Sequence, residues 1–304
     1  PLFDSELEAR FIEALKTLRV WDQPIEVSQK VVRGKPGFHV CVNGVGWDIE
    51  PQVSLGEREG VSKPSKADFV FWPENQSADV LPVAVFTDGF GYHADLAAER
   101  YRVGLDFVQR VAILRSGNYR VWSLTYDDVE ADPGTVADHR ENPFGSSGPN
   151  RSTLYDSQMN STELSGMRKI SKEGSMDSFV RYLGLPDTPL WKQVASIEAL
   201  LLSKPVPVES TARDILLTAL AQGAEEVLPD PEEHPGGGHV ASILRLDNEA
   251  GGTGLAMVLL STETGARNLD PGELLTVIRL MDGDNKPLHQ DFKKLWNGAL
   301  SAHN

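Results

Sequence analysis

SKADFVFWPENQSADVLPVAVFTDGFGYH, residues 65–93, contains two apolar runs, each about as long as one strand. The first run covers residues 67–72, and the second covers residues 82–87 and stops at Asp88-Gly89. Short apolar runs between turn residues are typical of strands inside a sheet. We therefore expect two buried strands here, with acidic side chains in the first and at the end of the second.

The residues before this stretch predict one helix and three strands. Residues 4–18 carry apolar residues at Leu7, Phe11, Leu15 and Leu18, a spacing that places one apolar stripe along a helix. Asn43-Gly44 is a dipeptide that favours a two-residue β-hairpin turn. The predicted strands are residues 25–32, 38–42 and 45–53.

The residues after the stretch predict a second helix and a closing strand. Residues 95–115 have helical spacing, and residues 119–125 form the last apolar run. The order of helix, three or more strands, helix and strand predicts an α/β domain over residues 1–130. The helical spacing places four apolar residues on one face of the second helix, namely Val103, Phe107, Val111 and Leu114.

The rest of the chain predicts a connecting segment and a second domain. Residues 131–175 are rich in Asp, Pro, Gly, Ser, Thr and Asn, which is typical of a linker or a mobile loop. Residues 176–304 predict a small α+β domain of unknown role. Its expected elements are a hairpin of residues 240–247 and 254–261, and helices at 190–202, 212–222, 271–281 and 288–300.

The composition excludes several classes of protein. The 304 residues include 29 Lys plus Arg against 44 Asp plus Glu, and the resulting charge of −15 excludes a basic protein that coats DNA. No stretch approaches the roughly 18 apolar residues of a membrane span, so we expect no membrane partner. Cys41 is the single cysteine, which excludes an internal disulfide and makes a cytoplasmic location the default expectation. Because the chain begins with Pro1, we expect it to be a piece of a longer protein.

Asp68, Asp88 and His93 are the residues that suggest chemistry. Asp68 lies among aromatic residues, where an acid needs a cation, a donor or water. Asp88 ends the next strand, and His93 follows it closely. Two carboxylates that hold Mg²⁺, or alternatively Mn²⁺, and an imidazole that moves a proton are the groups required for phosphodiester hydrolysis. Taken singly, the three residues also fit a rim acid, a turn and a structural histidine.

Three segments together carry a family resemblance. Residues 67–70 (ADFV), 86–93 (FTDGFGYH) and 117–122 (GNYRVW) resemble the very short patch repair endonuclease branch of the PD-(D/E)xK nuclease superfamily. The resemblance implies a restriction-endonuclease-like fold, which is a mixed sheet flanked by helices. It also implies a Mg²⁺-dependent DNA endonuclease activity over about residues 4–130.

The resemblance assigns roles to individual residues. It implies that Asp68, Asp88 and the backbone carbonyl of Thr87 hold the metal, and that His93 assists the water or the leaving group. An acid in the first helix also belongs to the pattern, and Glu8 fits because Glu8, Phe11 and Leu15 reproduce the spacing of acid and apolar residues.

The sequence also departs from this family. Phe90 occupies the position of the usual superfamily lysine, although the very short patch branch likewise lacks that lysine and uses histidine. Cys41 alone cannot form the zinc site of the repair enzyme, and Gly91-Tyr92 replaces its mismatch-wedging aromatic pair. We therefore do not expect this chain to recognise mismatched base pairs, as the repair enzyme does.

A second resemblance concerns the parent protein. Residues 106–129 are similar to the C-terminal region of large DEAD/DEAH-box helicases of bacterial anti-phage defence systems of the Druantia-like type. This similarity implies DNA and either the remainder of a parent helicase chain or defence-system proteins as partners. The alternative hypothesis is a catalytically inactive nuclease-fold module that guides DNA or docks a protein.

Overall fold

The computed structural model describes residues 2–75, 79–94, 102–130, 174–202, 204–206, 239–247, 253–262, 274–280, 292–293, 296–300 and 304. The chain divides into two compact units. The first comprises Pro1–Asp138, Glu173–Thr188 and His303–Asn304, and the second comprises His139–Lys172 and Pro189–Ala302. Among the helices described, none is long and apolar enough to cross a membrane.

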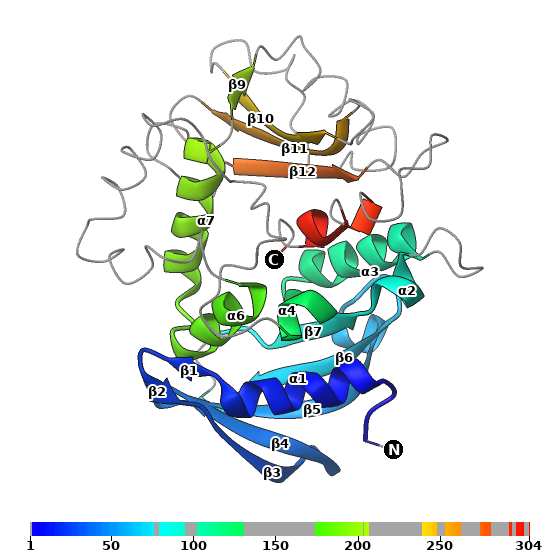
Figure 1. The fold of residues 1–304 in the computed structure, drawn as a ribbon, viewed down its shortest axis with the longest axis vertical. Coiled ribbons are helices and arrows are strands. Elements are labelled where there is room, and N and C mark those ends of the chain that lie inside the picture. Colours follow the sequence, from blue (N-terminus) through cyan, green and yellow to red (C-terminus); the bar gives the residue numbers. More distant parts are fainter. Residues whose placement is uncertain are drawn as a thin grey trace. The chain divides into compact units, whose positions relative to one another are not determined.

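A six-stranded mixed sheet with the order β3-β4-β5-β6-β7-β8 forms the centre of the first unit (Figure 1). Neighbouring strands are antiparallel, except that β7 and β8 run parallel. The predicted mixed α/β architecture, a sheet flanked by helices, is confirmed. The strands are β3 Glu26–Val32, β4 Lys35–Val42, β5 Val45–Leu55, β6 Ser65–Pro73, β7 Val83–Asp88 and β8 Arg120–Thr125, beside a small pair of β1 Arg19–Val20 and β2 Gln23–Pro24.

The predicted turn at Asn43-Gly44 is confirmed. Both residues have positive φ, 48° for Asn43 and 79° for Gly44, and they connect β4 to β5 with Val42 paired to Val45. Two positive φ values are those of a type I′ turn, whose twist matches that of the strands. This turn sets the register of β4 against β5.

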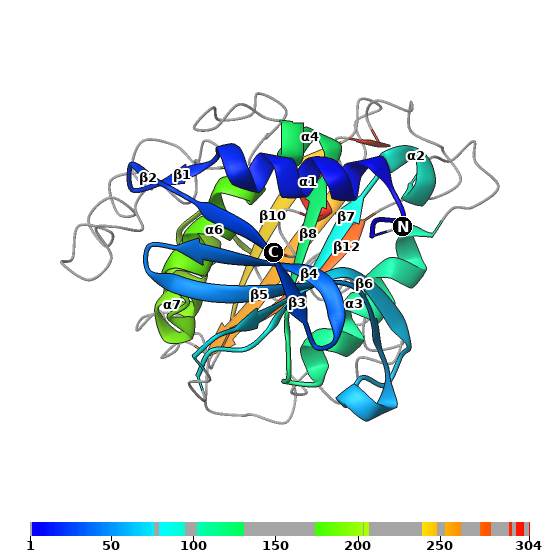
Figure 2. The ribbon, with the colours of Figure 1, turned by 90° about the horizontal axis from the view of Figure 1, so that it is seen from below.

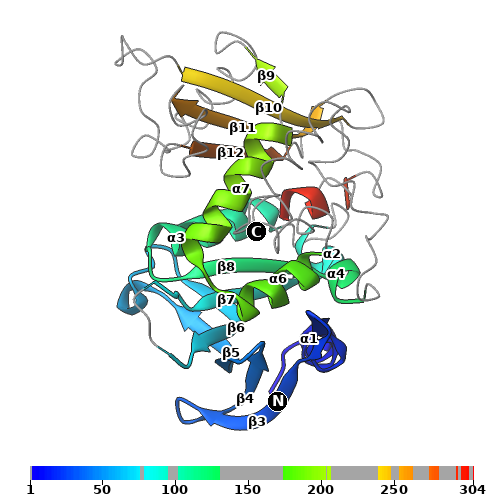
Figure 3. The same ribbon diagram turned by 90° about the vertical axis from the view of Figure 1, so that its left-hand side faces the viewer.

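Helices cover both faces of the sheet. Phe69 and Phe71 of β6 contact Phe11 of α1, and Phe71 also contacts Phe179 of α6. Val70, between them in sequence, packs with Ile113 of α3 on the other face, because successive strand side chains alternate. Figure 2 shows α4 beside α1, and Figure 3 shows α6 along β8. The helices are α1 Glu6–Thr17, α2 Phe90–His93, α3 Val103–Arg115, α4 Tyr126–Glu130 and α6 Ser175–Gly184.

The apolar face that the sequence indicates for α3 is not its buried face. Of its residues, Val103 is buried, whereas Val111 and Leu114 are 36% and 39% exposed. The buried side of the helix instead carries Asp106 and Arg110. These two charged side chains pair with groups on the sheet side, and that pairing fixes which face of α3 turns inward. The start of the predicted helix, residues 95–101, lies outside the described residues.

Helix α6 is part of the first unit, which differs from the predicted division at residue 176. The indole nitrogens of Trp47 and Trp122 donate to the carbonyl oxygens of Leu183 and Ser175 at 2.9 and 3.1 Å. Phe179 is fully buried between these elements. The core of the first unit therefore includes α6, a helix that follows the predicted linker in sequence. That linker, residues 131–175, lies almost wholly outside the described residues.

The second unit contains a four-stranded antiparallel sheet with the order β12-β11-β10-β9. The predicted hairpin and the helix at 190–202 are confirmed, and residues 292–293 and 296–300 are helical within the predicted 288–300. The helix expected at 271–281 is wrong, because Leu274–Leu280 is a strand that pairs with β11 and is rich in β-branched residues. The helix expected at 212–222 lies outside the described residues. The elements are α7 Thr188–Leu202, β9 Lys204–Val206, β10 His239–Asp247, β11 Thr253–Thr262 and β12 Leu274–Leu280.

Candidate functional site

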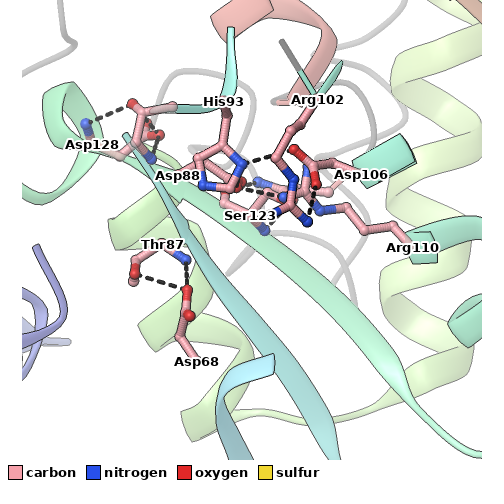
Figure 4. Close-up of polar contacts among 11 residues, drawn as sticks. Asp68, Thr87, Asp88, His93, Arg102, Asp106, Arg110, Ser123 and Asp128 are labelled. Carbon is pink, nitrogen blue, oxygen red and sulfur yellow. Dashed lines mark hydrogen bonds and ion pairs between the residues drawn. The ribbon is translucent and has the colours of Figure 1, made fainter. Parts of the chain in front are cut away.

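The candidate site begins where β6 and β7 separate. Their pairing runs from Phe71 opposite Val83 to Phe69 opposite Val85 and then stops. Beyond that point the Asp68 carboxylate takes the place of the backbone ladder. The Thr87 amide N–H and the Thr87 hydroxyl both donate to Asp68 Oδ2, at 2.6 and 2.9 Å (Figure 4).

A change of face in β6 places the Asp68 carboxylate against β7. Phe69 contacts Phe11 on the α1 side, whereas Ala67 belongs to the core cluster on the α3 side. In a regular strand, residues two apart share a face, so the strand twists at Asp68. Gln52, between the β5 residues that pair with Ala67 and Phe69, has a φ of 56° at the same level of the sheet. The irregularity therefore extends across both strands.

The backbone of Thr87 offers a further oxygen at this point. In a strand, the N–H and C=O of one residue point to the same edge. Because the Thr87 N–H donates to Asp68, its carbonyl oxygen also faces the β6 edge, where the ladder has ended. The oxygens of Asp68 and Thr87 thus lie at one gap between two strands.

Glu8 contributes a second carboxylate from α1. The helix begins after Ser5, whose hydroxyl accepts from the Glu8 N–H at 3.2 Å, as an N-cap does. Glu8 Oε2 accepts from Gln52 Nε2 at 2.5 Å and from the Asp4 N–H at 3.1 Å. Glu8 is 2% exposed, so its position depends on these donors.

The pKa of Asp68 is raised to about 7, from an ordinary value of 3.8. Burial is the main cause, and the negative charges of Glu8 and Asp88 add to it, against the hydrogen bonds from Thr87 that lower the pKa. The surroundings thus disfavour the charged form of Asp68, and a bound cation would stabilise that form.

Asp88 is held by a buried cation. Arg110 Nη2 of α3 donates to Asp88 Oδ1 at 2.5 Å, and both residues are at most 2% exposed. The guanidinium carbon of Arg110 also lies 4.9 Å from the centre of the Phe86 ring. Asp88 Oδ2 is buried without a hydrogen-bond partner. A buried carboxylate oxygen that lacks a donor is costly, and it is a suitable ligand for a cation.

His93 is held by an acid from α3. Its Nδ1 lies 2.7 Å from Asp106 Oδ2 and 3.7 Å from Asp88 Oδ1. Asp106 also has Arg102 Nη2 at 3.6 Å from its other oxygen. The imidazole is 19% exposed, so one ring nitrogen is fixed while the ring still reaches solvent. An acid at Nδ1 favours the tautomer with the proton on Nδ1 and an acceptor at Nε2.

The predicted site residues thus fall into two neighbouring groups (Figure 4). Asp68 and Thr87 form one, with Glu8 close enough to affect the charge on Asp68, and Asp88 and His93 form the other. Ligand atoms of Glu8, Asp68, Asp88 and His93 do not gather in threes within 4.8 Å among the residues that the structure describes. The donors are of the chemical type that Mg²⁺ takes, since this ion is usually bound by one or two carboxylates and keeps several waters. Asp68, the Thr87 carbonyl and Asp88 Oδ2 are the candidate ligands.

Sequence reasoning did not assign Asp106 and Arg110 to the site. The signal was the spacing of Val103, Asp106, Arg110 and Ile113, which places two opposite charges on the same stripe as two buried apolar residues. Charged residues on a helix usually face water, so the sequence alone does not indicate that this stripe is buried.

Comparison with known proteins gives no further assignment: no family model, no curated protein and no solved structure matches the chain.

Proposed function

We propose that the first unit is a Mg²⁺-dependent DNA endonuclease domain with a restriction-endonuclease-like fold, in a helicase-containing anti-phage defence protein. The observation that carries this proposal is the Asp68 carboxylate in the gap between β6 and β7, bonded to the Thr87 N–H. The sequence resemblance to the very short patch branch supplies the substrate class, and the order of α1, antiparallel strands, α3 and β8 agrees with it. The parent helicase and the defence partners rest on the sequence resemblance alone.

The carboxylates would hold the metal. Asp68 and the Thr87 carbonyl face one gap, and Asp88 Oδ2 is a buried oxygen without a donor. Glu8, held by a hydrogen bond from Gln52, adds a further negative charge near Asp68. When bound, Mg²⁺ stabilises negative charge on the phosphorane and lowers the pKa of a bound water.

His93 would move the proton. With Nδ1 tied to Asp106, the Nε2 atom accepts a proton from water or returns one to the leaving oxygen. Asp106 acts through His93 and is therefore a positioning residue. Arg110 keeps Asp88 in place and compensates part of the negative charge.

A second candidate is a nuclease fold that binds DNA or protein without cutting. The buried Arg110–Asp88 pair favours it, because this pair already neutralises one of the proposed metal ligands. The net charge of −15 also weakens DNA binding by the isolated chain, since phosphate affinity depends on cations.

Cleavage by the purified chain distinguishes the two candidates. Single-stranded, duplex and forked DNA are incubated with Mg²⁺, Mn²⁺ or EDTA and with Asp68→Asn, His93→Ala and the exposed control Asp22→Asn. We expect metal-dependent cutting that Asp22→Asn retains and that the other two variants lose by at least about 100-fold. Cutting that persists in Asp68→Asn would contradict the assignment. No cutting on any substrate, with a melting temperature that Mg²⁺ leaves unchanged, would favour the inactive module.

A further inference from the structure

A second cluster of histidine and carboxylate side chains lies on strands β4 and β5 and just after β6, away from β7. His39 and Asp48 are directly opposite each other in the antiparallel pair, and His39 Nδ1 is 3.0 Å from Asp48 Oδ1. Glu74, the residue after β6, places Oε1 3.9 Å from the same ring nitrogen. The three side chains come from β4, from β5 and from the end of β6, so the sheet fixes the positions of their backbone atoms.

The backbone around Glu74 is arranged for this approach. The Glu74 N–H donates to the Gly46 carbonyl oxygen at 3.0 Å, which ties the end of β6 to β5. A Cβ at Gly46 would collide with the Glu74 carboxylate and come within 3.2 Å of His39 Cε1. The absence of a side chain at Gly46 therefore lets Glu74 reach the pair of His39 and Asp48.

The spacing of the three groups suits a small divalent ion. One ligand atom from each residue lies within 4.8 Å of the other two. An ion with bonds of about 2.0 to 2.2 Å in tetrahedral geometry holds its ligand atoms about 3.3 to 3.6 Å apart. Two of the separations, 3.0 and 3.9 Å, bracket that range, so small side-chain rotations would bring these ligand atoms to the spacing that such an ion requires.

A lysine now lies between the two carboxylates. Lys30 Nζ is 2.7 Å from Asp48 Oδ1 and 3.5 Å from Glu74 Oε1. Its side chain is 39% exposed, and exposed ion pairs of this kind contribute little to stability. A divalent ion would bind the imidazole and the two carboxylates more strongly than Lys30 does. The lysine carries a single charge, and its long, flexible side chain loses conformational freedom when it pairs.

We propose that His39, Asp48 and Glu74 bind one divalent transition-metal ion of the Zn²⁺ class, at a site separate from the candidate nuclease site. One imidazole and two carboxylates are a donor set that Zn²⁺ accepts, with water in the remaining position. The ion would cross-link β4, β5 and the end of β6, and Lys30 would compete with it for the two carboxylates.

Titration of the chelator-treated full chain with Zn²⁺ tests the proposal. We expect one equivalent to bind at the site, with an affinity that is weakened at least about tenfold by His39→Ala and by Glu74→Gln and is unchanged by Asp68→Asn. Lys30→Met should strengthen binding, because it removes the competing cation. The Glu74 side chain is half exposed, so Glu74→Gln is expected to fold even where another variant does not.

Two outcomes would overturn the site. The chain has 7 histidines and one free cysteine, so Zn²⁺ could bind elsewhere. Affinity that stays the same in both His39→Ala and Glu74→Gln, or that is lost in Cys41→Ser, would assign the ion to other residues. Circular dichroism of each variant, without Zn²⁺, verifies that a loss of binding is not a loss of fold.

Discussion

The charged form of Asp68 is disfavoured in the folded chain, and a bound cation would stabilise it. Its two hydrogen bonds from Thr87 lower its pKa, but burial and the charges of Glu8 and Asp88 raise it further. The folded chain therefore holds a proton on Asp68 up to a pKa of about 7, whereas the unfolded chain releases it near 3.8. A metal ion would displace this proton, so metal affinity should increase as the pH rises through 7.

This proton predicts a stability difference that depends on pH. The raised pKa contributes stability that is present below pH 3.8 and lost as the pH rises through about 7. Asp68→Asn keeps an acceptor for the Thr87 N–H but carries no charge. In EDTA at pH 8 we expect this variant to be more stable than the wild type by roughly 4 kcal/mol, at about 1.4 kcal/mol for each pKa unit, with a difference below about 1 kcal/mol at pH 4. Urea unfolding at the two pH values measures this, and equal destabilisation at both would contradict it.

Arg110 predicts a second effect at the scale of one residue. Its removal leaves the buried Asp88 carboxylate without a cation, and we expect Arg110→Met to lower the free energy of unfolding by about 3 to 5 kcal/mol. Asp88→Asn in the same chain should restore part of that loss, because the uncompensated charge is then gone. A double-mutant cycle from urea denaturation gives the coupling, and a coupling below about 0.5 kcal/mol would refute the buried ion pair.

At the scale of elements, α3 is where sequence and structure differ most. Apolar periodicity suggested one face, but the buried stripe consists of Val103, Asp106, Arg110 and Ile113. The pairs of Asp106 with His93 and of Arg110 with Asp88 join residues 13 and 22 positions apart, so the spacing within α3 does not identify their partners. Strands β4 to β8 were predictable because each carries its own apolar run beside turn residues, whereas the mostly exposed β3 was indicated by its β-branched residues.

Asp68, Asp88 and His93 could be selected from sequence because they lie in or next to two consecutive strands. β12 was mistaken for a helix, since a short apolar run does not distinguish the two and the decisive contact is the ladder with β11. The partners of His93 and Asp88 required the tertiary structure.

The face of α3 can be tested with two adjacent aliphatic residues. Ile113 is fully buried, and Leu114 is 39% exposed. We expect Ile113→Ala to lower the free energy of unfolding by about 2 to 4 kcal/mol, and Leu114→Ala to lower it by less than about 1 kcal/mol. Thermal and urea denaturation of both variants measure the difference, and a reversed order would mean that α3 packs through its predicted apolar face.

At the scale of the whole molecule, the first unit is discontinuous in sequence. Its core is completed by α6, whose Phe179 contacts Phe11, Phe71 and Trp122. Asn304, from the end of the chain, also exchanges hydrogen bonds with the Ser123 backbone at 2.7 Å. A unit of this kind forms its core only after distant segments have come together.

This discontinuity predicts the behaviour of fragments. A fragment of residues 1–130 lacks α6 and exposes the surface that Phe179 covers, so we expect it to melt without a sharp transition or to aggregate. A fragment of residues 1–190 retains α6 and should unfold cooperatively. Circular dichroism melts of both fragments make the comparison, and two identical cooperative transitions would show that α6 is dispensable.

The bond from the Thr87 amide to Asp68 gives this protein a spectroscopic probe. The amide proton of Thr87 lies in a 2.6 Å hydrogen bond to the carboxylate, so its chemical shift depends on the charge of Asp68. In an NMR titration we expect this resonance to move upfield as Asp68 takes up its proton near pH 7, and to move again when Mg²⁺ is added at constant pH. One backbone resonance would then report both the ionisation and the metal occupancy of the site, without a substrate.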